Sequence, residues 1–483
     1  MEEAQMKSKR PAKAARDQRY RDRHLRWTPL LERIQPDAAG IDCGAEHHYV
    51  AVPPDRDTQP VQAFRTFTGE LGRLADWLTR CRIKTVAMES TGVYWIPLFE
   101  ILEARGMEVV LVNAHHLRNV RGRKSDVSDC EWLRELHSVG LLSASFRPAA
   151  EIVVLRTYLR QRASLVGEAA SHIQRMQKAL TQMNLMLHLV LSDITGATGL
   201  KIVRSILDGE RDPARLAAHR DRRCHASIQE IIAALTGNYR TEHLFTLKQN
   251  FEAYEFDRKQ IAECDSAIQK LVDTLAAQQP PPTTELPARR PATPKRHEPA
   301  FDIRTPLHRL TGGADLSQID GIGPHAALQL IAEIGIDMSR WPSGNHFTSW
   351  LSLAPNNKIS GGRLLSSRTQ PSANRAAAIL RRCAMSLMRT STALGAFCRR
   401  LAARTGKATA VTATARKLAL LVYRVLRGDI TYSDPGAAAY AQLHHNRVLK
   451  ALRKRAQQLG LALLDLNTGE MLTAHSLSPK QLP

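Results

Sequence analysis

The sequence predicts an α/β domain followed by a helical region and a second, mostly helical domain. Short apolar strands, broken by polar turns, come first, and helical periodicity dominates from about residue 151 onward. At 483 residues the chain is long enough for several domains that each bury a core, and a hydrophobic content of 43% indicates a globular protein.

The charge balance predicts a polyanionic partner. Lysine and arginine number 68 against 46 aspartates and glutamates, giving a net charge of +22. Such an excess favours nucleic acid, with an anionic membrane surface as the rival. No run of about 18 apolar residues suggests a membrane span, and the basic start lacks the apolar core of a secretory signal. Seven scattered cysteines without a CxxC pair argue against a zinc knuckle or disulfide framework, so we expect a cytoplasmic protein.

The first domain is expected over residues 37–150, after a flexible basic arm over 1–36 that is either a solvated tail or a nucleic-acid contact. Strands are predicted near 40–44, 48–52, 61–67, 85–88 and 107–112. Helices are predicted through 71–78, over 93–105 and from about 126. Three hairpin-type strands followed by alternating helix and strand is the order of a ribonuclease-H-like fold.

Four carboxylates fall where such a domain concentrates chemistry. Asp42 lies on the first strand, Glu89 ends the fourth, and Asp126 and Asp129 lie three residues apart on one face of a helix start. Bare carboxylates about 5 Å apart repel by roughly 3 kcal/mol at an effective dielectric of about 20. A hard cation such as magnesium or manganese would relieve that repulsion and bind phosphates. The bland alternative is that Ser125 caps the helix and the early acids suit its positive end.

The middle of the chain is predicted to be helical over 151–275, as an antiparallel arm or coiled coil, with an ordinary helical bundle as the alternative. A Pro-rich basic linker, not covered by any core, is predicted over 276–305.

A second compact domain is predicted over 306–433, followed by a basic tail over 434–483 to which we assign no chemistry. Gly321 and Gly323 open a helix in a turn that is either a phosphate-binding half of a helix-hairpin-helix or a plain tight turn. Ser360 precedes two glycines, which leave its hydroxyl unencumbered. The basic and polar residues expected to contact nucleic acid are Arg118, Arg121, Arg123, Lys124, Arg363, Arg368, Asn374, Arg375, Arg381 and Arg382.

These motifs together resemble the DEDD transposases of the IS110 insertion-sequence family. The resemblance runs from about residue 38 to 432. It rests on Ile-Asp-Cys-Gly at Asp42, Met-Glu-Ser-Thr-Gly-Val-Tyr-Trp at Glu89 and Lys-Ser-Asp-Val-Ser-Asp at Asp126 and Asp129. The later part of the series is Ile-Asp-Gly-Ile-Gly-Pro, Arg-Trp-Pro-Ser, Leu-Ser-Leu-Ala-Pro and Ser-Gly-Gly-Arg.

The resemblance implies a RuvC-like first domain whose four acids bind magnesium and a second domain that supplies a serine, here Ser360. It implies cutting and rejoining of donor and target DNA through a covalent serine–DNA intermediate. It further implies a guide RNA from the element's non-coding end, association with the bacterial nucleoid, and a dimer or tetramer in which the serine of one subunit meets the acidic site of another.

This chain departs from the family pattern after the serine. Residues 370–374 read Gln-Pro-Ser-Ala-Asn where Lys-x-Gly-Asn is usual, and Ser366 and Ser367 are rival nucleophiles. Two other functions remain open from the residues. One is a RuvC-like nuclease that hydrolyses DNA with water and needs no serine. The other is a non-catalytic nucleic-acid-binding protein whose acids are structural.

Overall fold

The computed structural model describes residues 32–90, 92–112, 126–288, 297–464, 466, 469 and 471–472, without the side chains of 126–128 and 471–472. The chain divides into two compact units, Met1–Arg147 and Pro148–Pro483. The basic residues Arg118, Arg121, Arg123 and Lys124 lie outside the described residues. No described helix is long and apolar enough to cross a membrane.

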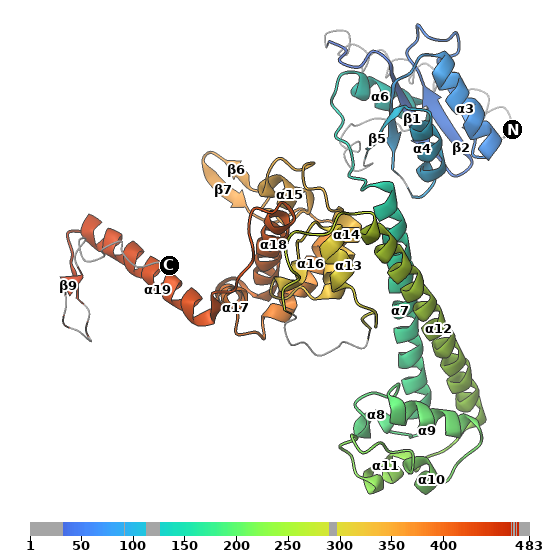
Figure 1. The fold of residues 1–483 in the computed structure, drawn as a ribbon, viewed down its shortest axis with the longest axis vertical. Coiled ribbons are helices and arrows are strands. Elements are labelled where there is room, and N and C mark those ends of the chain that lie inside the picture. Colours follow the sequence, from blue (N-terminus) through green and yellow to red (C-terminus); the bar gives the residue numbers. More distant parts are fainter. Residues whose placement is uncertain are drawn as a thin grey trace, which may run out of the picture. The chain divides into compact units, whose positions relative to one another are not determined.

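The first unit is a five-stranded sheet with helices on both faces (Figure 1). Its elements are β1 (Ala38–Cys43), β2 (His47–Ala51), β3 (Val61–Arg65), α3 (Thr68–Arg80), β4 (Thr85–Glu89), α4 (Trp95–Ala104), β5 (Glu108–Val112) and α6 (Asp126–Ser138). The strand order is β3-β2-β1-β4-β5. The β3–β2 and β2–β1 pairs are antiparallel, and β1–β4 and β4–β5 are parallel. This mixed sheet fits the ribonuclease-H-like order predicted from the sequence.

Alternation along the strands divides the core between the two faces. Ile41 on β1 and Met88 on β4 pack with Leu74 of α3 and Leu98 of α4 in one large cluster. On the opposite face, Ala87 of β4 packs with Leu133 of α6. Because successive side chains of a strand point to opposite faces, residues in step with Ala87 face α6.

The second unit begins with two long helices, α7 (Ala150–Gln182) and α12 (Thr241–Ala277), which lie side by side (Figure 1). They run antiparallel, because Arg162 pairs with Asp265 at 2.5 Å while His172 lies 3.8 Å from Asp257. The far end is closed by α8 (Leu187–Val190), α9 (Ala197–Leu207), α10 (Pro213–Ala217) and α11 (Ile228–Leu235), which share a core with the long helices. The region is helical as predicted, and coiled-coil packing stays a prediction.

The other end of α7 contacts the C-terminal helices. Arg156 donates to the carbonyl oxygens of Ala332 (3.0 Å) and Glu333 (2.9 Å), and Arg160 pairs with the Glu333 carboxylate at 2.8 Å. The remaining elements of the second unit follow in order: α13 (Arg304–Leu310), the short 3₁₀ helix η2 (Leu316–Gln318), α14 (Pro324–Ile334), α15 (Gly344–Trp350), β6 (Lys358–Ser360), β7 (Arg363–Ser366), α16 (Arg375–Leu387), α17 (Ala393–Thr405), α18 (Lys407–Leu426), α19 (Gly436–Gln458), β8 (Leu463–Leu464) and β9 (Met471–Leu472).

The Pro-rich segment differs in part from the uncovered linker that we predicted. Arg304 donates to the carbonyl oxygen of Pro287 at 2.8 Å, Thr284 donates to that of Gly313 at 3.3 Å, and Pro299 is buried. These contacts attach both described ends of the segment to folded structure. Proline lacks a backbone donor but leaves its carbonyl free to accept, which is how the segment is held at Pro287.

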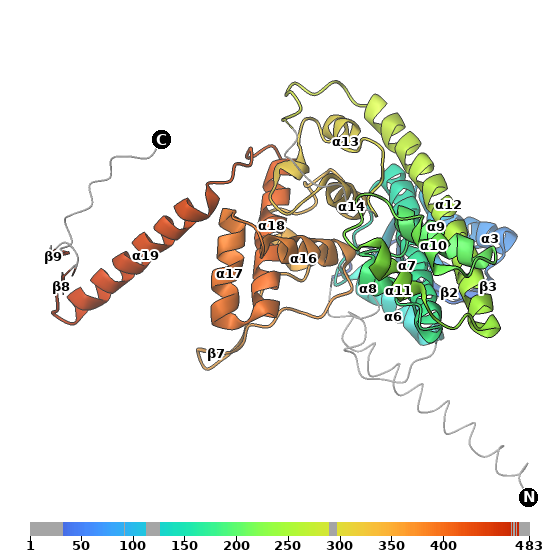
Figure 2. The same ribbon diagram turned by 90° about the horizontal axis from the view of Figure 1, so that it is seen from below.

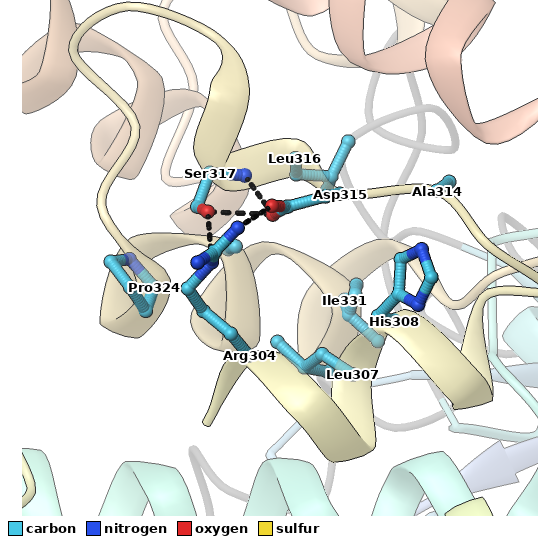
Figure 3. Close-up of a pocket in the computed structure, with 10 residues that line it drawn as sticks. Arg304, Leu307, His308, Ala314, Asp315, Leu316, Ser317, Pro324 and Ile331 are labelled. Atoms are coloured by element: carbon cyan, nitrogen blue, oxygen red, sulfur yellow. Dashed lines mark hydrogen bonds and ion pairs between the residues drawn. The ribbon is translucent and has the colours of Figure 1, made fainter. Parts of the chain in front are cut away.

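Arg304 also anchors the start of this domain (Figure 3). Its guanidinium contacts the Asp315 carboxylate at 2.5 Å and the Ser317 hydroxyl at 3.0 Å, and both side chains of the ion pair are at most 10% exposed. Burial alone would raise the pKa of Asp315, but hydrogen bonds from Arg304, Ser317 and Gln318 outweigh it and hold that pKa below its ordinary value. The pair therefore fixes α13 against η2.

Candidate active site

The first two predicted acids lie beside each other at one edge of the sheet. β1 and β4 are parallel neighbours with Gly40 opposite Ala87 and Ile41 opposite Met88. Continuing this register places Asp42 next to Glu89. Asp42 alternates in step with Gly40, and Glu89 with Ala87, so both side chains belong to the face covered by α6. Both are half-buried.

Gly40 brings α6 close to this face. A Cβ atom at position 40 would lie only 2.3 Å from both the Cys130 carbonyl oxygen and the Arg134 amide nitrogen. The absence of a side chain therefore lets the helix backbone touch β1. Since Asp126 begins α6 and half-buried Asp129 precedes Cys130, the acidic first turn lies near the ends of β1 and β4.

Two buried thiols lie beside this edge, and the nearby acids add to the rise in their pKa values. Burial raises the pKa of the Cys43 thiol well above its ordinary value, and the charges of Asp42 and Glu89 add to that rise. Burial raises the pKa of Cys130 to about 12, with further contributions from Glu131 and Asp42. Asp42 thus acts electrostatically on both its own strand and α6, as convergence of these elements requires.

Hydrogen bonds hold the end of β4 and the middle of α6. The amide and hydroxyl of Ser90 each donate to the Val112 carbonyl oxygen at 3.0 Å, which ties the residue after Glu89 to β5. On the α6 face, the Thr85 hydroxyl and His137 Nε2 are 2.8 Å apart, and both side chains are buried. Glu89 is therefore supported from a neighbouring strand and α6 from β4 itself.

The donor set suits a hard divalent cation, because carboxylate oxygens are the ligands that magnesium and manganese prefer. Among the side chains that the structure describes, no three His, Cys, Asp or Glu residues are grouped as a metal site. Asp126 is not among those side chains. Asp42, Glu89 and Asp129 are the described residues that would contribute oxygen ligands.

The predicted serine lies in the second unit, at the tip of the β6–β7 hairpin. Ser360 pairs with Arg363 across Gly361 and Gly362, whose φ angles are +54° and +74°. Two consecutive positive φ values are typical of a tight two-residue hairpin turn, which glycine adopts without strain. Ser360 is exposed, and its hydroxyl has no hydrogen-bond partner in the described part of the chain.

The rival serines are placed differently. Ser366 is half-buried, and its hydroxyl oxygen accepts from the Arg368 amide at 3.3 Å, whereas Ser367 is exposed beyond the end of β7. Of the three, Ser360 alone sits between a strand end and a glycine pair. That position lets a bulky phosphate approach from the turn side.

Several predicted nucleic-acid contacts have structural roles. Gly321 has φ +83°, and a Cβ there would lie 2.8 Å from the Leu387 side chain, so this turn is tight because it packs against α16. Gly323 is the N-cap of α14, and the Asn374 side chain caps α16 by accepting from the Ala377 amide at 3.0 Å. The structure therefore accounts for these positions without a phosphate.

The predicted arginines are mostly exposed. Arg363 and Arg368 lie on and beside the hairpin, and Arg375 begins α16. Arg381 is half-buried, and Arg382 donates to the Gln329 side chain at 3.3 Å. These arginines lie on the hairpin or follow it in the sequence, so they stay candidates for nucleic-acid contact.

Two family models match the chain. Residues 39–185 match a model described as a transposase, of the DEDD type and IS110 group, and residues 313–399 match one described as transposase IS116/IS110/IS902 family. The chain belongs to the IS110 family of transposases. The first match contains all four acids and the second contains Ser360. Membership implies DNA as the substrate and a divalent metal as the cofactor of an IS110-family enzyme. A comparison with curated proteins found no match.

Sequence reasoning missed the residue that assembles the site. Gly40 carries no chemistry, yet it sets the distance between α6 and β1. A glycine two residues before a predicted catalytic aspartate was the available signal, since glycine inside a strand often marks a close backbone approach.

Proposed function

We propose that this IS110-family transposase cuts and rejoins DNA with an acidic site made of Asp42, Glu89, Asp126 and Asp129 and a nucleophile, Ser360. The observation that carries the proposal is the pairing of Asp42 and Glu89 at the ends of adjacent parallel strands, on the face against which α6 packs at Gly40. Chemistry in open α/β sheets gathers at such strand ends.

The acids would hold magnesium or manganese, which supplies charge stabilisation for a transferring phosphate and activation of an attacking oxygen. The protein's part is to fix the carboxylates. The β1–β4 register sets the relative positions of Asp42 and Glu89, and the contact at Gly40 sets the position of the start of α6. Thr85 and His137 hold the sheet and helix together behind them.

Ser360 would attack a DNA phosphorus through Oγ. An Oγ–P bond forms, one phosphorus–oxygen bond of the DNA breaks, and the departing sugar oxygen takes a proton while the serine hydroxyl loses one. In the rejoining step, a DNA hydroxyl attacks the phosphoserine, restoring a phosphodiester and the serine hydroxyl. The number of phosphate ester bonds is unchanged, so no ATP is required. A serine hydroxyl is a weak nucleophile until it is activated, so Ser360 needs the acidic site.

Guidance by an RNA from the element's non-coding end, and assembly as a dimer or tetramer, belong to the same proposal. They rest on the family resemblance. The acids lie in the first compact unit and the serine in the second, an arrangement that leaves either subunit free to supply the serine.

A covalent-trapping assay tests the proposal. Full-length protein, magnesium, RNA transcribed from the flanking non-coding DNA, and labelled donor and target DNA are mixed and run on a denaturing gel. We expect a protein–DNA adduct that requires magnesium and disappears in Ser360→Ala and in Asp129→Asn. Ser367→Ala and Glu46→Gln, which alter an exposed serine and an exposed carboxylate of the same domains, should keep it.

The two other functions give different results. Cleaved DNA without an adduct, retained in Ser360→Ala, would identify a hydrolytic nuclease. Salt-sensitive binding without any magnesium-dependent product would leave a binding protein. Loss of the adduct in Ser367→Ala and not in Ser360→Ala would move the nucleophile.

A further inference from the structure

The C-terminal helices carry a long stretch of uncompensated positive charge. Residues 338–428 contain sixteen lysines and arginines and no aspartate or glutamate, and α19 adds five more cations without an acid. The two intervening acids are engaged locally. Asp429 faces Arg427 at 3.7 Å, and Asp434 accepts from the Ala393 amide at 3.0 Å. The surface of these helices is therefore strongly basic.

An aromatic pair gathers cations from three helices at one point. Lys417 of α18 places its ammonium nitrogen 4.5 Å from the centroid of the Phe397 ring of α17. Phe397 meets Tyr440 of α19 edge-on, with ring centroids 6.3 Å apart. Arg400 of α17 donates to the Tyr440 hydroxyl at 3.0 Å and to His444 Nε2 at 2.9 Å. Figure 2 shows α17 and α18 side by side, with α19 leaving the pair.

Arg447 completes the cluster. It lies three residues after His444, on the same side of α19. The pKa of Lys417 is lowered because partial burial disfavours its charged form and because Arg447 and Arg400 repel it. Within the described part of the chain, no carboxylate lies within ion-pair distance of Arg400, Lys417 or Arg447. All three side chains are exposed at the surface.

We infer that Arg400, Lys417 and Arg447 bind a phosphate group of a nucleic-acid backbone. Like charges held together without an acid repel one another, and a phosphate would reverse that cost and accept from both guanidinium groups. Lys450 and Lys454 continue the same face of α19 for about 10 Å at 1.5 Å per residue, so the strand would run along this helix. All of these residues lie outside the two segments matched by the transposase models. The site is distinct from the acids and from Ser360.

An anionic membrane is the competing ligand, because Val448 and Leu452 are exposed on the opposite face of α19 and basic amphipathic helices bind lipid surfaces. The three-helix cluster favours nucleic acid. Its cations converge around an aromatic pair into one discrete site, whereas a lipid surface needs only a flat basic stripe on a single helix.

The test is the salt dependence of binding by full-length protein. Fluorescence anisotropy with labelled duplex DNA, single-stranded DNA and duplex RNA of arbitrary sequence is measured between 50 and 300 mM NaCl. The double variant Lys417→Gln/Arg447→Gln is compared with a control that removes two cations already paired to glutamates in their own helices, Arg73→Gln/Lys248→Gln. The charge-conserving Lys417→Arg/Arg447→Lys is the rescue. Magnesium is omitted, so strand transfer is not required and failure of the catalytic proposal leaves this test intact.

We expect the double variant to lower the slope of log K against log salt by about two, and to weaken binding on the order of tenfold at 0.1 M, since each phosphate contact contributes a slope of about 0.9 in duplex DNA. The control and rescue variants should keep the wild-type slope, and the polymer with the largest change identifies the ligand. Because the variant relieves repulsion in the free protein, its melting temperature should be equal to or above that of the wild type.

Three results would overturn the inference. An unchanged slope on all three polymers is the first. The second is an equal loss in the control, which would indicate net charge alone. The third is a change in another property of the double variant while the slopes stay the same. Loss of co-sedimentation with phosphatidylserine vesicles would assign the cluster to a membrane, and a changed mass of the free protein in solution would assign it to an acidic protein surface.

Discussion

The acidic site and the serine hairpin are built in opposite ways. Asp42 and Glu89 extend from strands whose neighbours Ile41 and Met88 are fully buried. Ser360 ends a strand whose neighbour Ile359 is 64% exposed, and Leu364 and Leu365 across the hairpin are 58% and 69% exposed. The carboxylates are therefore positioned by the core of their own unit. The serine is positioned by the pairing of β6 with β7 and by their tight turn, beside exposed side chains, so its final placement depends on what the hairpin contacts.

This contrast suits the chemistry that we propose. Carboxylates that share a metal must be held close together against their mutual repulsion, which requires a rigid scaffold. A nucleophile that meets a DNA phosphate, and then releases it, is served by an exposed tip with little around it. Four predictions test the contrast, from the largest expected effect to the smallest.

The contrast would fail most directly if the domain that carries the hairpin were as weakly stabilised as the hairpin itself. Arg304→Met leaves the Asp315 carboxylate buried without its cation, which should lower the free energy of unfolding by about 3–5 kcal/mol. Chemical denaturation measures this change in the free energy of unfolding, and hydrogen exchange of peptides from 304–334 shows whether it arises in this region. Arg309→Met, which removes only bonds to the carbonyls of Ala277 and Gln279, is the milder comparison. Equal effects would mean that the buried pair adds no special support.

The direction of the Asp315 pKa shift determines how the stabilising effect of this pair depends on pH. The pKa of Asp315 is lowered in the folded state, so its stabilisation is present above about pH 4, the ordinary range of an unfolded aspartate, and is lost as pH falls through the folded value. Arg304→Met should remove that acid-dependent part of the unfolding curve.

The second prediction concerns the contact that brings α6 to the acids. Gly40→Ala places a methyl group 2.3 Å from two backbone atoms, which should cost about 3 kcal/mol and displace the acidic turn. The adduct in the trapping assay should be lost with it. Gly72→Ala in α3, where an added Cβ meets nothing, should instead be neutral or stabilise by about 0.5–1 kcal/mol. A folded, fully active Gly40→Ala protein would show that the close approach is dispensable.

The third prediction separates the two units by pH. Burial lowers the pKa of His48 and of His137 to about 4. An unfolded histidine titrates near 6.5, so the unfolded first unit takes up protons between about pH 6.5 and 4 that the folded unit refuses. The contribution of the two neutral histidines to the free energy of unfolding is fully present above pH 6.5. It is lost as the pH falls, by up to about 3 kcal/mol for each histidine at pH 4.

Hydrogen exchange at pH 7 and pH 5 measures the effect in each unit. Peptides from β1, β4 and α6 should lose protection at pH 5 more than peptides from α14 and α16. His137→Gln should reduce that loss. Equal losses in both units would contradict the assignment.

The smallest effect is expected at the hairpin. Ile359→Ala should change the free energy of unfolding by no more than about 0.5 kcal/mol because the side chain is already exposed. Ile41→Ala, its buried counterpart beside Asp42, should cost about 2–5 kcal/mol. If Ile359→Ala nevertheless weakens adduct formation, the hairpin uses its apolar face in the assembled complex. A large loss of stability would show that the hairpin is packed in solution.

Much of the first unit was predictable from the sequence because its signals are local. The apolar runs at 85–88 and 107–112 and the helical spacing through 71–78 predicted the sheet and its helices, and motif spacing predicted the four acids and the serine. The second unit was harder. Its long helices were predicted, but docking of the Pro-rich segment at Pro287 was not, because a carbonyl that accepts from a distant arginine leaves no sequence pattern.

The sequence by itself determined the family, the succession of strands and helices along the first unit and the candidate chemistry, because each depends on short motifs and on periodicity. Only the tertiary structure decided which glycines are structural. The sequence marks Gly40 only as a glycine inside a strand and Gly321 only as part of a turn, and their packing roles appear only when α6 and α16 approach them. The same holds for Arg400, Lys417 and Arg447. They lie on three separate helices, and only packing around Phe397 and Tyr440 turns a diffuse basic composition into one site, because side-chain distance is set by the fold and not by spacing along the chain.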